Sequence, residues 1–170
     1  MSSITQNPPI TMVGIGEIAI VKEEGGVLKT MALGSCVGVM IYEKTTGTIG
    51  MAHIALPESQ ISPAAALTRP GRFADTAIPE LIKKLSQATG VKITPRNSVV
   101  KIAGGANICD GASTFNIGKR NVMAVRKFLW KFRLGPSRED IGGSLSRTVT
   151  MDRNTGRIVI SNPTKGTWEL

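Results

Sequence analysis

A cysteine and the single histidine of this 170-residue chain form the most reactive combination that the sequence offers. Cys36 follows a glycine-containing turn at residues 33–35 and precedes the apolar run 37–42, which is typical of a strand. His53 lies in the next apolar run, residues 49–56. In a hairpin of neighbouring strands, both side chains would lie near the same open end of a sheet. A thiol beside an imidazole is the minimum set for cysteine nucleophilic catalysis, because a nearby imidazolium lowers the pKa of the thiol.

The turn before the cysteine adds a means of stabilising negative charge on a substrate oxygen. Gly34 allows the backbone to turn sharply, so that backbone amides near Ser35 and Cys36 can point at that oxygen. Simpler interpretations stay open, since a cysteine at a strand end is often a small buried hydrophobe and a lone histidine is often a core residue. Cys109 is a rival nucleophile, although it has no histidine of its own.

Five motifs follow one another over about residues 12–160: Thr30-x-x-Leu33-Gly34-Ser35-Cys36-Val37, Gly50-Met51-Ala52-His53-Ile54-x-Leu56-Pro57, Lys101-Ile102-x-Gly104-Gly105-Ala106-Asn107, Asn116-Ile117-Gly118-x-Arg120-Asn121-Val122 and Glu139-Asp140-x-Gly142-Gly143. In this order they resemble the CheD family of bacterial chemotaxis. Members of that family are described as chemoreceptor glutamine deamidases that also bind a phosphatase, CheC. The chain departs from the family at Ser144, where an asparagine is expected.

The resemblance implies a catalytic set and a reaction. Cys36 and His53 would be catalytic, Thr30 would orient the imidazole, and the turn at Gly34 and Ser35 would hold the oxyanion. On its own, the β-branch of Thr30 indicates no more than a strand position. The implied reaction hydrolyses glutamine side-chain amides of chemoreceptors to glutamate through a cysteine thioester and releases ammonia. The implied partners are the cytoplasmic helical domains of chemoreceptors and a CheC-type phosphatase.

Two other classes of function stay open. The domain would be a non-catalytic regulatory module if it mainly engages a CheC-type phosphatase. Cys36 would instead be a redox sensor if its oxidation carries the signal. Replacement of the thiol separates catalysis from mere binding.

Composition excludes several other classes. The formal net charge of +9 invites a nucleic-acid hypothesis, but the basic residues are dispersed and only 4% of residues are aromatic, so we expect no nucleic-acid partner. A docking face for an acidic protein is the more interesting interpretation. One histidine and two distant cysteines predict no zinc site, and no other cofactor is expected. The apolar runs are short and no signal peptide is evident, so we expect a cytoplasmic protein without membrane insertion.

The pattern of elements predicts a single α/β (α+β) domain over residues 11–162, between an N-terminal tail at 1–10 and a C-terminal tail at 163–170. We expect a layered, cysteine-hydrolase-like sandwich in which two main helices, at 73–89 and 116–132, pack on a mostly antiparallel or mixed sheet. The proline-containing loop at 56–71 leaves directly after His53 and would form one wall of the site.

Overall fold

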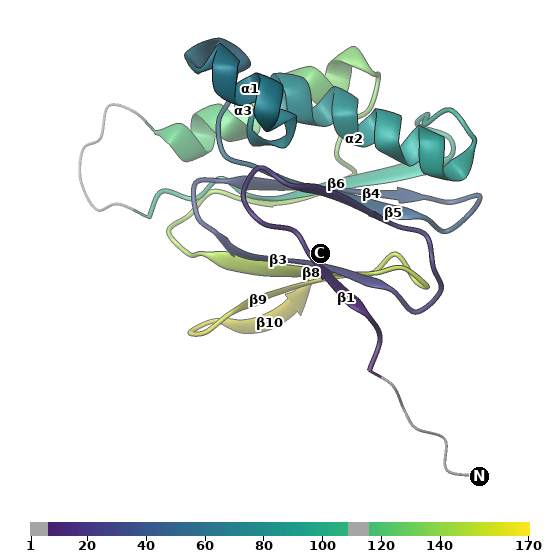
Figure 1. Cartoon of the computed structure of the whole chain (residues 1–170). Helices are drawn as coiled ribbons and strands as arrows, with labels where there is room; N and C mark the ends of the chain where they lie inside the picture. Colours follow the sequence, from purple (N-terminus) through teal and green to yellow (C-terminus); the bar gives the residue numbers. More distant parts are fainter. Residues whose placement is uncertain (1–6, 109–115) are drawn as a thin grey trace.

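The protein is built in three layers, with helices on one side and two five-stranded sheets stacked beneath them (Figure 1). The structure is a computed structural model, and it describes residues 7–108 and 116–170. The sheet that lies against the helices is called the inner sheet here, and the other is called the outer sheet. This arrangement confirms the predicted layered α/β architecture with mostly antiparallel strands.

The inner sheet carries the long apolar strands. In spatial order it contains β2 (Ile18–Val21), β5 (Ile49–Ile54), β4 (Val37–Glu43), β6 (Ser98–Gly104) and β7 (Arg138–Ile141). Every residue of β5 is buried, because one face meets the helices and the other meets the outer sheet. Only the β6–β7 pair is parallel in this sheet.

The outer sheet begins near the N-terminus and is completed at the C-terminus. Its strands, in spatial order, are β1 (Ile10–Met12), β3 (Val27–Leu33), β8 (Arg147–Asp152), β9 (Ile158–Asn162) and β10 (Gly166–Glu169). β10, which pairs antiparallel with β9, lies within the stretch 163–170 that we expected to be a C-terminal tail. β7 was also not predicted, because its sequence Arg-Glu-Asp-Ile is mostly polar.

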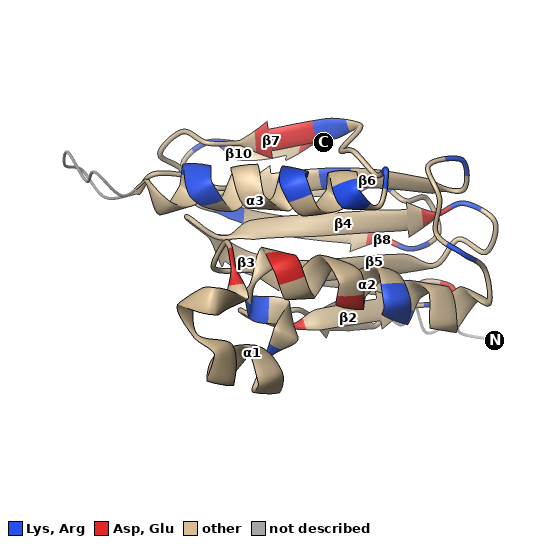
Figure 2. Ribbon diagram, turned by 90° about the horizontal axis from the view of Figure 1, so that it is seen from above, with Lys and Arg blue, Asp and Glu red and all other residues tan. Residues whose placement is uncertain are grey.

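Two helices cover the inner sheet as the sequence predicted. They are α2 (Ala74–Thr89) and α3 (Ile117–Lys131), which lie over the strands of the inner sheet in Figure 2. Their apolar faces form one core with the helix-facing residues of β4, β5 and β6. Gly90 ends α2 in the left-handed region, with φ of 72°. In the first turn of α2, the Asp75 carboxylate accepts hydrogen bonds from the backbone amide and the hydroxyl of Ser59.

The connection from β5 to α2, which the sequence predicted as a loop, contains regular structure. It contains the helix α1 (Pro63–Thr68) between two 3₁₀ turns, Ser59–Ile61 and Pro70–Arg72. The backbone amides of Ala55 and Leu56 both donate to the carbonyl of Arg72 at 3.0 Å, so the two ends of this connection lie together. None of the described helices has the length and hydropathy needed to cross a bilayer.

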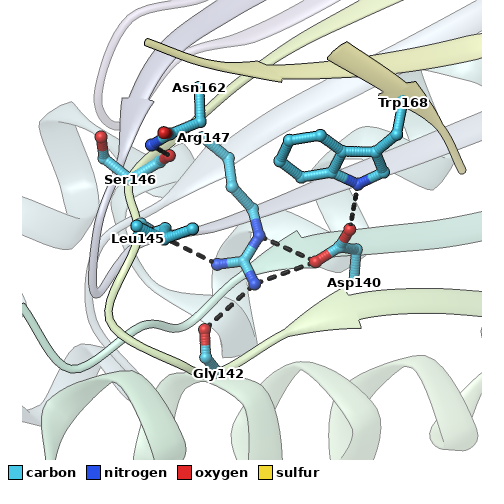
Figure 3. Close-up of polar contacts among 7 residues, drawn as sticks. All are labelled: Asp140, Gly142, Leu145, Ser146, Arg147, Asn162 and Trp168. Carbon is cyan, nitrogen blue, oxygen red and sulfur yellow. Dashed lines mark hydrogen bonds and ion pairs between the residues drawn. The ribbon is translucent and has the colours of Figure 1, made fainter. Parts of the chain in front are cut away.

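An ion pair joins the two sheets at the edge where β7 lies (Figure 3). Arg147 of β8 is 7% exposed, and its guanidinium donates to the Asp140 carboxylate at 2.9 Å and to the carbonyl of Gly142 at 3.0 Å. The indole of Trp168 donates to the other oxygen of Asp140. Arg147 also pairs with Leu33 at the end of β3, so this network anchors the strand that leads into the cysteine turn.

Candidate active site

The cysteine lies where the chain passes from the outer sheet to the inner one. β3 ends at Leu33 and β4 begins at Val37, so the turn Gly34-Ser35-Cys36 is the crossing between the sheets. A bulge interrupts the β3–β8 register between Thr30 and Leu33. Within the bulge, Ala32 adopts φ of 56°, a conformation that costs a non-glycine residue energy. Because of the bulge, Thr30 and Leu33 both face the core even though their spacing is odd.

The pairing of β4 with β5 places Cys36 and His53 on one face of the inner sheet. His53 pairs with Gly38, and Cys36 lies two positions before Gly38, so the two side chains are diagonal neighbours. Diagonal neighbours lie about 7–8 Å apart at the backbone, within reach of side-chain contact. Cys36 packs against the apolar cluster between the sheets, the same space that His53 enters. The hairpin expected from the sequence is therefore present, and it brings the thiol and the imidazole to the same end.

Thr30 reaches the imidazole from the opposite sheet. Its hydroxyl oxygen lies 2.7 Å from Nδ1 of His53 and 2.6 Å from the carbonyl oxygen of Val13. A carbonyl can only accept, so the single hydroxyl hydrogen goes to Val13 and the hydroxyl oxygen accepts from Nδ1–H. We therefore assign the Nδ1–H tautomer to His53, which leaves Nε2 unprotonated and able to act as a base. The contact between Thr30 and His53 agrees with the orienting role that the resemblance implies.

Burial keeps the imidazole neutral. His53 is 1% exposed, and its pKa is lowered chiefly by desolvation, against smaller raising effects of the Val13 carbonyl and the Glu17 carboxylate. Its backbone is fixed as well, because Gly16 donates to its carbonyl at 2.8 Å. Nε2 is buried and makes no hydrogen bond within residues 7–108 and 116–170. The basic nitrogen is therefore buried and makes no hydrogen bond to the described residues.

The charge state of Cys36 differs from the expectation of a resting thiolate. Burial raises the pKa of the half-buried Cys36 thiol, and this effect outweighs the lowering effects of its own backbone amide and of the Arg72 guanidinium. His53 is not among the groups that lower it, since the imidazole is itself held neutral. The pair therefore rests as neutral thiol and neutral imidazole, an arrangement that suits removal of the thiol proton during attack.

The cysteine turn is held through its carbonyls, which leaves its amides available. The carbonyls of Gly34 and Cys36 accept from the amides of Ala106 and Gly105, both at 2.8 Å. Within the described ranges, the amides of Gly34 and Ser35 donate to no acceptor, and that of Cys36 approaches only its own thiol. Free amides beside Cys36 have the character of oxyanion-hole donors, the role expected for the Gly34–Ser35 turn.

Asn121 of α3 belongs to this site although it was not among the predicted site residues. Its Nδ2 donates to the carbonyls of Ser35 and Ala55, both at 2.9 Å. Arg72 is a second residue that sequence reasoning did not place here. The sequence did carry a signal for Asn121, because it stands in one of the motifs that resemble the CheD family, whereas no sequence pattern singles out Arg72.

Two other sequence predictions concern Cys109 and Ser144. Cys109, the rival nucleophile, lies outside the described residues. Ser144 is exposed and directly follows the Gly142–Gly143 turn, far in sequence from Cys36 and His53. No cluster of three or more potential metal ligands occurs in the part of the chain that the structure describes.

Comparison with known proteins agrees with these motifs. A family model described as "CheD chemotactic sensory transduction" matches residues 55–162. The chain belongs to the CheD family. One curated CheD relative, from Syntrophotalea carbinolica and named "Probable chemoreceptor glutamine deamidase CheD", is 45% identical over 94% of this chain and 98% of its own length. The Thermotoga maritima CheD, named "Chemoreceptor glutamine deamidase CheD", is 38% identical over 88% of this chain and 89% of its own length.

A further CheD relative and one solved structure are also similar. The Solibacter usitatus relative, again named "Probable chemoreceptor glutamine deamidase CheD", is 40% identical over 86% of this chain and 85% of its own length. The crystal structure of the Bacillus licheniformis hypothetical protein YfiH has a TM-score of 0.46 and 10% identity, covering 84% of this chain and 61% of that one.

Proposed function

We propose that this CheD protein is a protein-glutamine deamidase that converts glutamine side chains of chemoreceptors to glutamate. The observation that carries the proposal is the line of contacts from Val13 through the Thr30 hydroxyl to Nδ1 of His53, which leaves Nε2 free on the face shared with Cys36. The printed names of the CheD relatives supply the substrate class.

The first half of the proposed reaction forms a thioester. Nε2 of His53 takes the thiol proton as Sγ of Cys36 attacks the carboxamide carbon of the glutamine. The carbonyl oxygen becomes an oxyanion and accepts hydrogen bonds from the amides of Ser35 and Cys36; one such donor is worth about 2.7–4 kcal/mol in comparable hydrolases. The imidazolium then gives its proton to the departing nitrogen. The carbon–nitrogen bond breaks, and ammonia leaves.

The second half regenerates the enzyme. Nε2 of His53 removes a proton from water, and the oxygen attacks the thioester carbon. The carbon–sulfur bond breaks, glutamate is released, and the proton returns to the sulfur of Cys36. In both halves the transient imidazolium is stabilised at Nδ1–H by the Thr30 oxygen, a neutral partner that stabilises less than a carboxylate would. The sum is glutamine plus water giving glutamate plus ammonia.

The positive net charge of the molecule favours docking of an acidic partner. We expect this protein to act in the cytoplasm. Basic positions appear as blue bands on the ribbon of α3 in Figure 2. The exposed basic residues of this helix are Lys119, Arg120, Arg126, Lys127 and Lys131. Arg126 and Lys127 are already paired with Glu139 and Glu58, so the remaining three are the stronger candidates for a partner's carboxylates. Complementary charge mainly speeds encounter.

The deciding experiment incubates the protein with purified cytoplasmic domains of chemoreceptors and maps glutamine-to-glutamate conversion by peptide mass spectrometry. Parent protein should convert particular glutamines, and Cys36→Ser should convert none while keeping the parent's melting temperature. Absence of conversion in every receptor domain, with a folded parent, would contradict the proposal.

The regulatory alternative, engagement of a CheC-type phosphatase, makes a separate prediction. We expect the same domain to bind such a phosphatase, because the family resemblance implies both activities. If Cys36→Ser still binds the phosphatase and also supports normal receptor signalling in cells, the regulatory role is the main one. If signalling is lost although binding persists, hydrolysis is the main role.

A further inference from the structure

Asn121 connects the two segments that carry the proposed nucleophile and base. Its side chain is fully buried, and its Nδ2 donates both hydrogens, one to the carbonyl of Ser35 and one to that of Ala55, at 2.9 Å each. Ser35 directly precedes Cys36, and Ala55 is two residues after His53. We propose that Asn121 is a positioning residue that fixes the thiol relative to the imidazole; this rests on the proposed function.

The start of α3 is built to bring this side chain in close. Asn116 caps the helix by accepting from the amide of Lys119 at 3.0 Å. Gly118 lies one turn before Asn121, and a Cβ there would come within 2.5 Å of the carbonyl oxygens of Gly105 and Ala106. Only glycine permits this approach, because the obstructing atoms are backbone. The helix therefore packs directly on the segment whose amides hold the cysteine turn.

The chemistry of the contact requires an amide nitrogen. Both acceptors are carbonyls, so the side chain must supply two hydrogens from one atom in a compact group, which asparagine does and serine does not. An aspartate of the same shape would offer only acceptors. Oδ1 of Asn121 is buried and makes no hydrogen bond in the described part of the chain. The two donated hydrogen bonds are therefore what hold this side chain in place.

The bridge extends to a third segment. Ala55, whose carbonyl accepts from Asn121, donates its own amide to the carbonyl of Arg72 at 3.0 Å. The guanidinium of Arg72 lies near enough to Cys36 to favour its thiolate form. Loss of the Asn121 amide would thus remove the contacts that hold the cysteine turn and the backbone at Ala55. Because Ala55 holds the carbonyl of Arg72, the position of Arg72 would loosen as well.

The test compares Asn121→Ala with Asn162→Ala, a matched control. Asn162 is also a buried asparagine, 7% exposed, and its Nδ2 donates to the carbonyl of Ser146 at 2.8 Å, but it lies in β9 of the outer sheet. Two readouts are taken: kcat and KM for receptor-domain deamidation, and the pH dependence of Cys36 alkylation by iodoacetamide. The second needs no substrate, so it stays informative if deamidation of receptors is not observed.

We expect Asn121→Ala to lower kcat about 100-fold with little change in KM, because misplacement of reacting groups by about 1 Å costs that much. The alkylation midpoint at Cys36 should move down toward that of a free thiol, since the loosened turn exposes the sulfur. Asn162→Ala should lose stability but keep the parent's kcat and alkylation curve.

The proposal is overturned if folded Asn121→Ala has the parent's alkylation curve and kcat. It is also overturned if the two alanine variants lose kcat in proportion to their lost stability. If Asn121→Ala does not fold, Asn121→Ser replaces it, and its single donor should give a smaller change in the same direction. An unchanged curve in the serine variant would equally overturn the proposal.

Discussion

Replacing Thr30 by valine removes the hydroxyl while keeping the shape of the side chain. Thr30 is completely buried, and its oxygen satisfies both the Val13 carbonyl and Nδ1–H of His53. In Thr30→Val both groups are left unpaired, and an unsatisfied buried group costs about 1–3 kcal/mol. With two such groups, the free energy of unfolding should therefore fall by about 2–6 kcal/mol.

The effect of Thr30→Val on turnover comes from the charged form of the histidine. Nδ1–H donates to the Thr30 oxygen while the imidazolium exists, and a hydrogen bond to a charged group is worth about 1.5–3 kcal/mol. Its loss corresponds to a ~10- to 100-fold drop in kcat. The hydroxyl also fixes the Nδ1–H tautomer, so its loss allows the tautomer in which Nε2 carries the proton and is no base.

The assay measures receptor-domain deamidation and thermal unfolding for the parent, Thr30→Val, Thr30→Ser and His53→Ala. Thr30→Ser keeps the hydroxyl and should retain most of the parent's kcat. His53→Ala should be the slowest, because both base and acid are gone. Equal kcat for folded Thr30→Val and Thr30→Ser would refute the reasoning, as would full turnover in His53→Ala.

Three further predictions concern pH, backbone strain and charge. The pKa of His53 is lowered on folding, so the unfolded state binds more protons than the folded state below about pH 6.5. The free energy of unfolding should therefore fall as the pH drops below that value. An unchanged melting temperature from pH 7 to 5 would contradict this. Ala32→Gly should be tolerated, whereas Ala32→Val should unfold about 1–2 kcal/mol more easily than Ala32→Gly in denaturant titration, because a β-branched residue fits φ of 56° poorly. Association with an acidic receptor domain should slow between low and moderate salt, since exposed charges are screened beyond about 10 Å at 0.1 M. If association rates measured by stopped flow do not change with salt concentration, the net charge of +9 plays no part in docking.

Hydrophobic periodicity located most of the elements that build the core. The strands around Cys36 and His53 and the helices at 73–89 and 116–132 follow the periods of 2 and 3.6 because one face of each is buried. β7 and β10 do not show such a period, since they are short edge strands with mostly polar residues. How the strands divide into two sheets was not predicted, because that division depends on contacts between distant segments.

The candidate site shows the same distinction between local and long-range information. The Cys36–His53 relation follows from one hairpin and could be inferred from spacing. The place of Thr30 could not, because it contacts His53 across the two sheets, and only the family resemblance suggested its role. The neutral state of the thiol also depends on burial, which the sequence near Cys36 does not reveal.

The most direct test of the central claim, that Cys36 is the nucleophile, is capture of the acyl-enzyme. The protein is mixed with a receptor domain, quenched in acid during turnover and digested, and cysteine-containing peptides are examined by mass spectrometry before and after hydroxylamine, which cleaves thioesters. We expect a hydroxylamine-sensitive glutamyl adduct on Cys36 in the parent and in Cys109→Ala, and neither adduct nor turnover in Cys36→Ala. An adduct on Cys109, or normal deamidation by folded Cys36→Ala, would contradict it.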